Sequence, residues 1–236
     1  MQRPAASDPR PPVHRARRSM KTVCMIPVKL RSERVPDKNI RSLGGRPLMH
    51  YIQRVCLETQ ALDAVYVYCS SDEVAPYVLD GVTLLIRPAW LDGDECNCND
   101  LLWEFMGQVD ADIYVASHAT APFTRPASIE ACIAQVESGA YDSAFLAHPL
   151  RQMMWQNGQP LNFDPQHFPR TQDLAPIHVE ASGAFVVARS TFEKYGRRVG
   201  EQVYIHEVDA IEAFDIDWPQ DFAIAEAILQ AMPERS

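Results

Sequence analysis

Two charged segments, one near each end of the chain, carry residue types suited to phosphate and metal chemistry. The first runs from Lys29 to Asn39 and holds four basic residues within ten positions, namely Lys29, Arg31, Arg34 and Lys38. The cationic side chains and backbone N–H groups of such a loop can bind a triphosphate. The loop has neither the GxxxxGK[ST] pattern of a P-loop nor the GxGxxG pattern of a dinucleotide site. A solvated charged loop is the alternative interpretation.

The second segment is 214–221, with the sequence Phe-Asp-Ile-Asp-Trp-Pro-Gln-Asp. We expect residues 213–216 to form a strand, which would point Asp215 and Asp217 to the same face. Two carboxylates on one face suit Mg²⁺, which takes a few carboxylates together with phosphate oxygens and water. Asp221 is expected to start the last helix. The alternative is that Asp217 caps that helix and Asp215 lies at the surface.

Strand-like and helix-like segments alternate along the chain. The expected strands are 22–28, 64–69, 82–86, 112–116, 142–147, 184–188 and 213–216. One expected helix begins at Pro47, and three others span 99–108, 128–137 and 219–232. This alternation predicts a three-layer Rossmann-like α/β fold with a mostly parallel central sheet. Ligands bind such sheets at the carboxyl ends of the strands, which is where the basic loop lies.

Composition limits the classes of protein. The 236 residues are 47% apolar and carry a net charge of −9. Residues 1–19 hold five Arg and one Asp, so residues 20–236 carry −13. The acidic body argues against a nucleic-acid partner, and we expect no membrane span. Most of the six Cys lie within apolar stretches, which indicates reduced thiols and a cytoplasmic protein.

We expect residues 1–19 to be a disordered basic tail, because they are rich in Pro and Arg and lack an apolar stretch. Met20 directly precedes the first expected strand, so either Met1 or Met20 is the physiological start. An arginine-rich contact arm is the other interpretation of the tail. Residues 20–236 are expected to form one domain.

Both charged segments resemble those of the acylneuraminate cytidylyltransferase family, the CMP-sialic acid synthetases and their relatives. The family's loop reads Pro-Ala-Arg-x-x-Ser-Lys-x-x-x-x-Lys-Asn. Its matches in this chain are Pro27, Ser32, Lys38 and Asn39, followed by a similar segment at 43–48. The family also ends in Asp-Ile-Asp before a C-terminal helix. The resemblance covers residues 22 to about 230 and implies a nucleotidyltransferase fold.

The resemblance implies roles for residues at the matching positions. The implied catalytic residues are Lys38, Asp215 and Asp217, and the two Asp would hold Mg²⁺, or Mn²⁺ as the alternative metal. The implied nucleotide-binding residues are Lys29, Arg31, Ser32, Arg34, Lys38, Asn39, Arg87, Asn99 and Thr120. The implied substrate-binding residues are His118, Arg170, Gln172 and Glu180. Arg170 is the best candidate to hold a substrate carboxylate because guanidinium matches that group bidentately; a surface arginine in a hairpin is the alternative.

Four positions depart from the family pattern. Lys29 stands where the family usually has Arg, and Glu33 stands where it often has Lys. Lys29 keeps the charge but cannot clamp a phosphate bidentately. His118 replaces a usual Gln, and Glu180 replaces a neutral polar residue. His118 either hydrogen-bonds a substrate or caps a strand end. The departures leave the acceptor open.

The activity implied by the resemblance is transfer of CMP from CTP to a nonulosonic acid such as a sialic-acid-like sugar, with release of pyrophosphate. The alternatives are CMP transfer to a Kdo-like ulosonic acid or a phosphonate, and a non-catalytic nucleotide-binding homologue. A nucleotide-sugar glycosyltransferase also pairs Asp with metal, but the Lys38-Asn39 loop argues against it. Residues 150–180 resemble the family's dimerisation insert and imply a homodimer.

Overall fold

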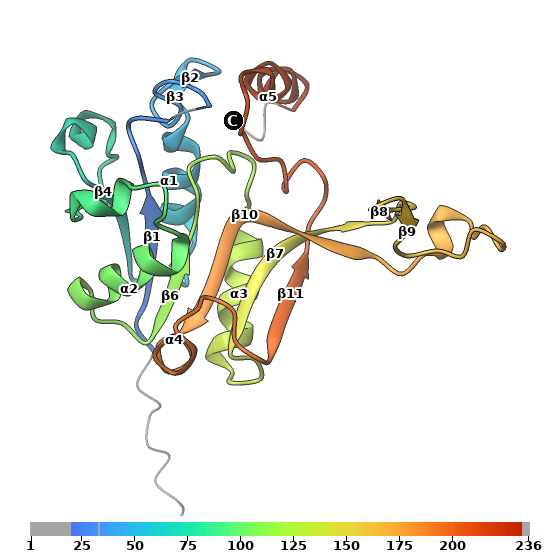
Figure 1. The fold of residues 1–236 in the computed structure, drawn as a ribbon. Coiled ribbons are helices and arrows are strands. Elements are labelled where there is room, and N and C mark those ends of the chain that lie inside the picture. The colour runs from blue at the N-terminus through green and yellow to red at the C-terminus, as the bar shows by residue number, and fades with distance from the viewer. Residues whose placement is uncertain (1–19, 33, 233–236) are drawn as a thin grey trace, which may run out of the picture.

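A seven-stranded sheet forms the centre of the molecule (Figure 1). The computed structural model describes residues 20–32 and 34–232. The strand order is β11-β7-β10-β6-β1-β4-β5. The strands are β1 (Thr22–Pro27), β4 (Ala64–Cys69), β5 (Val82–Ile86), β6 (Ile113–Ala116), β7 (Ser143–Leu150), β10 (Ile177–Ala188) and β11 (Val203–Glu207). Pairing is parallel except where β10 runs antiparallel to β6 and β7, so the prediction of a mostly parallel sheet is confirmed.

Helices cover both faces of this sheet. They are α1 (Met49–Glu58), α2 (Cys98–Gln108), α3 (Pro126–Glu137), α4 (Arg189–Tyr195) and α5 (Pro219–Ala231), with short 3₁₀ turns at Asp72–Tyr77, Ala89–Asp92 and Thr171–Asp173. In β1, Cys24 and Ile26 pack in the core beneath α1 and α3, whereas Val23 and Met25 pack in the core beneath α2 and α4. The continuous apolar run of β1 therefore reflects burial on both faces, and the three-layer fold follows.

Four elements differ from the sequence expectation. The strand predicted at 213–216 is wrong. The Asp209 carboxylate accepts the backbone N–H groups of Ile211 and Glu212 and holds a turn at 210–213, and residues 214–217 that follow are irregular. The last strand of the sheet is β11 instead, and α4 was also not predicted. Strand β10 begins seven residues before its predicted start at 184, since its first half pairs with the extended end of β7.

An arm formed by residues 151–176 projects from the sheet between β7 and β10 (Figure 1). It contains the two-residue hairpin β8 (Trp155–Gln156) and β9 (Gln159–Pro160). Asn157 and Gly158 adopt positive φ angles of 51° and 76°, as the tight turn between such strands requires. The hairpin character expected for 150–178 is thus observed. A second small hairpin, β2 (Ser42–Leu43) and β3 (Arg46–Pro47), precedes α1.

Among the described residues, no helix is long and apolar enough to cross a membrane. The predicted tail at 1–19 lies outside the described residues.

Candidate active site

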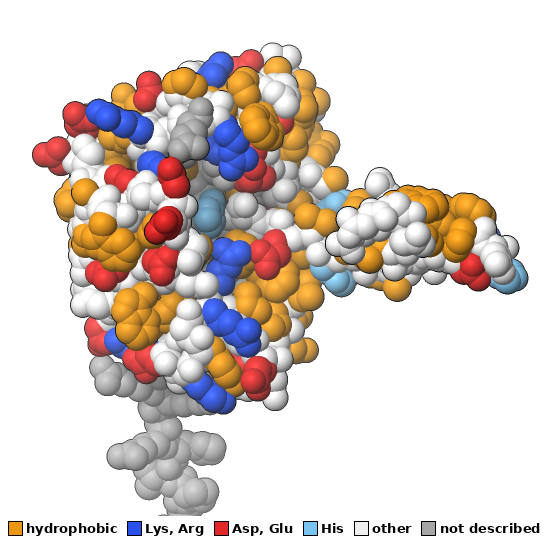
Figure 2. Space-filling model, viewed as in Figure 1, with side chains coloured by type: hydrophobic (Ala, Val, Ile, Leu, Met, Phe, Trp, Pro, Cys, Tyr) orange, Lys and Arg blue, Asp and Glu red, His pale blue; other side chains and the backbone are white. Residues whose placement is uncertain are grey.

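A cavity of about 550 Å³ opens at the carboxyl edge of the sheet. It extends from the segment after β5, past the loop after β1, to the loop after β6 and the middle of β10. Figure 2 shows the hollow, with a histidine side chain at its floor and basic and acidic side chains around its mouth. The lining includes Lys29, Arg31, Ser32, Arg34, Lys38, Asn39, Arg87, Asp92, Asp94, Cys96, His118, Thr120, Ser182, Asp215 and Asp217. Its size suits a small-molecule ligand.

The basic loop after β1 is held in shape by its own polar groups. The Asn39 side chain is almost fully buried and donates from Nδ2 to the carbonyl of Lys29 at 2.9 Å. The backbone N–H of Val28 bonds Tyr68 O on β4, which keeps the loop at the edge of the sheet. The Lys29 ammonium lies 3.8 Å from the Asp94 carboxylate across the cavity mouth. Glu33, one of the departures from the family pattern, lies outside the described residues.

The two charged segments meet at Asp217. Lys38 Nζ lies 3.2 Å from Asp217 Oδ1 and donates to the carbonyl of Ile216 at 2.9 Å. Arg34 Nη1 lies 3.0 Å from the other carboxylate oxygen, Oδ2. The Lys38 side chain is only 12% exposed, so its ammonium is fixed near the floor of the cavity. Residues separated by nearly the whole domain thus form one charged centre.

Asp215 is a partly buried acid with an unused oxygen. Its Oδ1 is buried and has no hydrogen-bond partner among the described residues. Burial raises the pKa of Asp215, and the neighbouring charge of Asp217 acts in the same direction. The hydroxyl of Thr120, the ammonium of Lys38 and the hydroxyl of Ser182 act against this rise. A buried, unpartnered carboxylate oxygen beside a second carboxylate fits a hard cation, which would relieve both the desolvation and the repulsion.

The described residues contain no group of three or more His, Cys, Asp or Glu side chains placed to hold a metal ion. Two carboxylates alone still fit Mg²⁺, because this ion usually keeps several waters and takes other ligands from substrate phosphates. The chemistry of the donor set therefore favours a cation that binds together with a phosphorylated ligand.

The segment that carries the two Asp is anchored at both ends. Toward the C-terminus, Asp221 Oδ2 accepts the backbone N–H groups of Asp217 (2.8 Å) and Trp218 (2.7 Å), so Asp221 caps α5 as predicted. In the middle, the N–H of Ile216 bonds Thr120 O at 2.9 Å, which ties the segment to the loop after β6.

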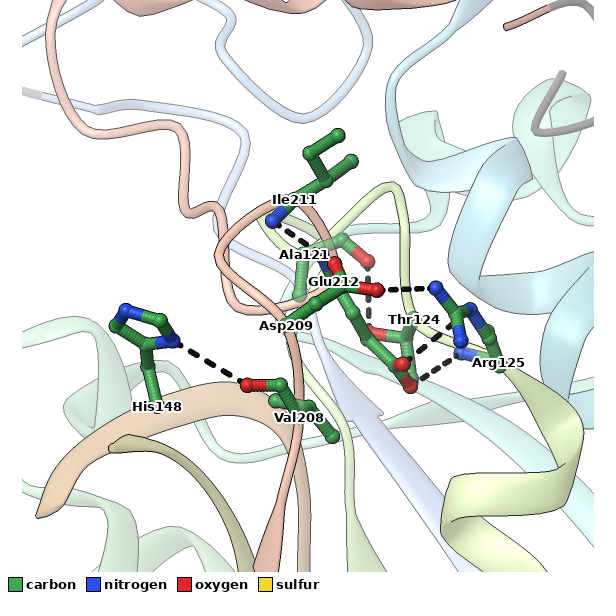
Figure 3. A network of polar contacts seen from close by, with 8 residues as sticks. All are labelled: Ala121, Thr124, Arg125, His148, Val208, Asp209, Ile211 and Glu212. Carbon is green, nitrogen blue, oxygen red and sulfur yellow. Dashed lines mark hydrogen bonds and ion pairs between the residues drawn. The ribbon is translucent and has the colours of Figure 1, made fainter. Parts of the chain in front are cut away.

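At its other end the segment is held by Arg125, the residue preceding α3 (Figure 3). Arg125 donates to Asp209 and, through Nε at 3.3 Å, to Glu212. The Glu212 side chain is 2% exposed, and its Oε1 also accepts the backbone N–H of Arg125 at 3.0 Å. One arginine therefore links two carboxylates and fixes the turn that precedes Asp215.

Arg87 forms the wall of the cavity near β5. Its guanidinium is buried, with Nη2 2.6 Å from Asp92 Oδ1 and Nη1 donating to Tyr68 O at 3.2 Å. Ser70 Oγ hydrogen-bonds the second oxygen of Asp92. The Arg87 Nε is buried without a partner in the described structure. Arg87 thus shapes this wall and still has one free donor.

His118 lies on the opposite side of the cavity, near β10. Its backbone N–H bonds Ser182 O at 3.1 Å, and its Nε2 is buried without a partner among the described groups. Burial lowers the pKa of His118, and the positive charges of Arg198 and Lys38 act in the same direction, which brings it to about 4. The ring is therefore neutral near pH 7 and offers one donor and one acceptor nitrogen.

Four of the predicted site residues do not line the cavity. Asn99 lies in the first turn of α2, where its Oδ1 accepts the backbone N–H of Arg198 at 3.0 Å. Arg170 and Gln172 lie on the arm, and Arg170 is 73% exposed and paired with Asp173 at 2.7 Å. Glu180 pairs with Arg198 at 2.8 Å.

Other lining residues were not predicted, namely Asp92, Asp94, Cys96 and Ser182. Two signals in the sequence point to three of these residues. Asp92 and Asp94 belong to an acidic run directly after Arg87. Ser182 lies within the matched stretch that begins at Glu180.

Comparison with known proteins identifies the family. A family model described as "Cytidylyltransferase" matches residues 23–233. The chain belongs to the cytidylyltransferase family. Among curated proteins, the N-acylneuraminate cytidylyltransferase of Oncorhynchus mykiss is 26% identical over 202 residues, which is 80% of this chain and 46% of that protein. The 3-deoxy-manno-octulosonate cytidylyltransferase of Myxococcus xanthus is 28% identical over 193 residues, which is 76% of this chain and 74% of that protein.

The chain spans about half the length of the N-acylneuraminate cytidylyltransferases that it matches. Among solved structures, a CMP:2-keto-3-deoxy-manno-octonic acid synthetase complexed with CTP superposes with a TM-score of 0.68 at 21% identity. The match covers 89% of this chain and 99% of that one. A 4-diphosphocytidyl-2C-methyl-D-erythritol synthase from Anaerococcus prevotii gives a TM-score of 0.63 at 10% identity, with 90% and 97% covered. These structures share the fold of this chain.

Proposed function

We propose that this protein is a cytidylyltransferase that transfers CMP from CTP to a sugar acid and releases pyrophosphate. The observation that carries the proposal is the convergence of Lys38, Asp215 and Asp217 in one cavity at the carboxyl edge of the sheet. Membership of the cytidylyltransferase family supports the same activity. Attack of a sugar hydroxyl on the α-phosphorus would form the new P–O bond and break the bond to pyrophosphate.

The basic lining would hold the triphosphate. Lys38, Lys29, Arg31 and Arg34 bring four positive charges to one side of the cavity. Positioning and charge neutralisation are the main contributions a protein makes to such transfers. Ser32, Asn39, Arg87 and Thr120 line the same cavity and are our remaining candidates for nucleotide contacts. We assign Asn99 no direct contact, because its side-chain oxygen already accepts the backbone N–H of Arg198.

Asp215 and Asp217 would hold Mg²⁺, with Mn²⁺ as the alternative metal. When bound, the ion would neutralise phosphate charge and lower the pKa of the attacking hydroxyl. In the free chain both oxygens of Asp217 are paired with cations, Lys38 and Arg34. These cations would shift toward the phosphates as the nucleotide enters, which would free the carboxylate.

The acceptor is proposed to be a nonulosonic acid. Two curated relatives are named for N-acylneuraminate and 3-deoxy-manno-octulosonate, and both compounds are sugar acids. His118 would hydrogen-bond the acceptor through its neutral ring, since its Nε2 has no partner. A Kdo-like acid and a phosphonate are the alternatives.

A homodimer is proposed from the arm. Trp155, Leu161 and Phe168 expose 59%, 52% and 67% of their surface on this extension, and large exposed apolar groups favour a protein contact. Arg170 and Gln172 lie on the same arm, away from the cavity of their own chain. A substrate role for these two residues would therefore require the cavity of a partner. Light scattering on wild type and a Trp155→Ser, Phe168→Ser double variant tests the dimer, which the double variant should weaken.

We place the enzyme in the cytoplasm, because its six cysteines are free thiols and four of them are buried.

The test of the activity is pyrophosphate release with Mg²⁺ from CTP, ATP, GTP or UTP, against N-acetylneuraminate, legionaminate, pseudaminate, Kdo and small phosphonates. We expect release from CTP with a sugar acid. Asp217→Asn should reduce turnover by at least about 100-fold in a folded protein, as loss of a main electrostatic contribution does. Asp110→Asn is the control, because this exposed Asp pairs only with Arg189 outside the cavity. Full turnover by Asp217→Asn would refute the metal assignment.

A non-catalytic nucleotide-binding protein is the second candidate. It would bind CTP saturably in calorimetry and release no pyrophosphate with any acceptor of the panel. That result would replace the proposed enzyme by a binding protein.

A further inference from the structure

Arg198 is a cation beside the cavity that the sequence did not single out. It lies in the loop between α4 and β11, and its side chain is 22% exposed. Its Cζ lies 3.6 Å from the centroid of the Phe185 ring, within the range of a strong cation–π contact. The Phe185 ring in turn meets the His118 ring edge-on at 6.2 Å. Arg198 is therefore near the histidine that lines the cavity.

Three contacts fix the orientation of Arg198. Its backbone N–H donates to Asn99 Oδ1 at 3.0 Å, its guanidinium stacks on Phe185, and its Nη2 donates to Glu180 Oε2 at 2.8 Å. A guanidinium has five N–H donors. Within the described structure only one of them is used in a hydrogen bond, that to Glu180. The planar group is thus held in place with most of its donors available to an anion.

The position of Arg198 matches the acceptor end of the cavity. Arg87 and Asp92 line the end near β5, and Lys38 lies at the middle with the two Asp. His118 and Ser182 line the end near β10, next to Arg198. A triphosphate held by the basic loop leaves this last end for the second substrate.

We propose that Arg198 binds the carboxylate of the sugar-acid acceptor, an inference that rests on the proposed function. Arginine suits this role because its fork of N–H donors matches a carboxylate bidentately. Arg170, the candidate from sequence, is on the arm and paired with Asp173. Pairing with Glu180 does not exclude a second carboxylate, since Arg125 of this chain contacts both Asp209 and Glu212. Glu180 becomes a positioning residue that orients the guanidinium.

Arg198→Gln tests the assignment in steady-state kinetics, using the sugar acid on which the wild type turns over fastest. Loss of a charge-assisted bidentate contact should raise KM for the acid about 10- to 100-fold. KM for CTP should stay within about twofold, because the nucleotide lies at the other end of the cavity. Arg197→Gln is the matched control, because Arg197 neighbours Arg198 in the same loop and its guanidinium lies 5.5 Å from the centroid of the half-buried Tyr195 ring at the end of α4. It should leave both constants unchanged.

The methyl ester of the same acid separates carboxylate binding from a structural role. Wild type should prefer acid over ester by at least about tenfold, and Arg198→Gln should lose most of that preference. Arg198→Lys keeps the charge and should recover part of it, and this variant also serves if the Gln variant does not fold. A preference for acid over ester that is unchanged in the folded variants would overturn the inference and leave the proposed function intact. Absence of turnover by the wild type with every acid would overturn the proposed function, and the inference with it.

Discussion

Replacing Glu212 with alanine removes the buried carboxylate that holds the turn before Asp215. Glu212 accepts the backbone N–H of Arg125 at 3.0 Å and pairs with its Nε at 3.3 Å. In Glu212→Ala the backbone donor of Arg125 loses its acceptor. The guanidinium keeps Asp209 as a partner and is 45% exposed, so water replaces part of what it loses.

The magnitude follows from these contacts. A hydrogen bond involving a charged group contributes about 1.5–3 kcal/mol net. Because the guanidinium side of the contact is screened by water, we assign Glu212→Ala a loss of about 2–3 kcal/mol. For a chain of this size each kcal/mol lowers Tm by about 2–4 °C, so Tm should fall by about 4–12 °C.

The assay is urea unfolding followed by circular dichroism, together with Mn²⁺ affinity measured by electron paramagnetic resonance in the presence of CTP. Mn²⁺ affinity should fall, because Glu212 fixes the turn that leads to Asp215 and Asp217. Glu193→Ala is the control, since this 55% exposed residue pairs with Arg189 on the surface of α4 and should cost about 0.5 kcal/mol or less. Equal stability losses in the two variants would refute the reasoning.

Four further variants test other parts of the structure. Wild type should lose about 2 kcal/mol of stability in urea unfolding between pH 7 and pH 5, because the pKa of His118 is about 6.5 in the unfolded chain and about 4 in the folded one. His118→Gln should lack this loss, because glutamine does not titrate. An equal loss in both proteins would contradict this assignment. Gly183→Ala should lower Tm, since a Cβ there would overlap the Thr124 hydroxyl, whereas Gly107→Ala, with open space around it in α2, should raise stability by about 0.5–1 kcal/mol. Lys38→Gln should weaken CTP binding by about tenfold in calorimetry and change cytidine binding little, because the Lys38 ammonium is proposed to contact the phosphates. Equal weakening of CTP and cytidine binding would contradict a phosphate contact.

Local patterns determined much of the fold. The apolar run at 22–28 predicts a buried strand, and β1 (Thr22–Pro27) is buried on both faces of the sheet. Asp221 at the start of the last helix is a signal that acts within one helical turn. Helix α3 begins at Pro126, two residues before its expected start at 128. By contrast, 213–216 has strand-like residues but forms no strand. The Asp209 side chain accepts the backbone N–H groups of Ile211 and Glu212 and holds a turn at 210–213 just before it.

The residue types that do chemistry were also visible in the sequence. The basic loop and the Asp-Ile-Asp segment indicated phosphate and metal binding before any contact between them was known. Their meeting at Asp217 depends on the order of strands in the sheet, which brings residues 179 positions apart to within 3.2 Å.

Only the tertiary structure decided which arginine lies near His118, at the second end of the cavity. Arg170 matches the family pattern, but it lies on the arm and does not line the cavity of its own chain. Arg198 matches no pattern, and the loop after α4 brings it onto Phe185. Sequence by itself determined residue chemistry and the local elements, because these depend on neighbours within a few positions. The paths of the long connections determined which side chains meet, since those paths depend on packing across the whole sheet.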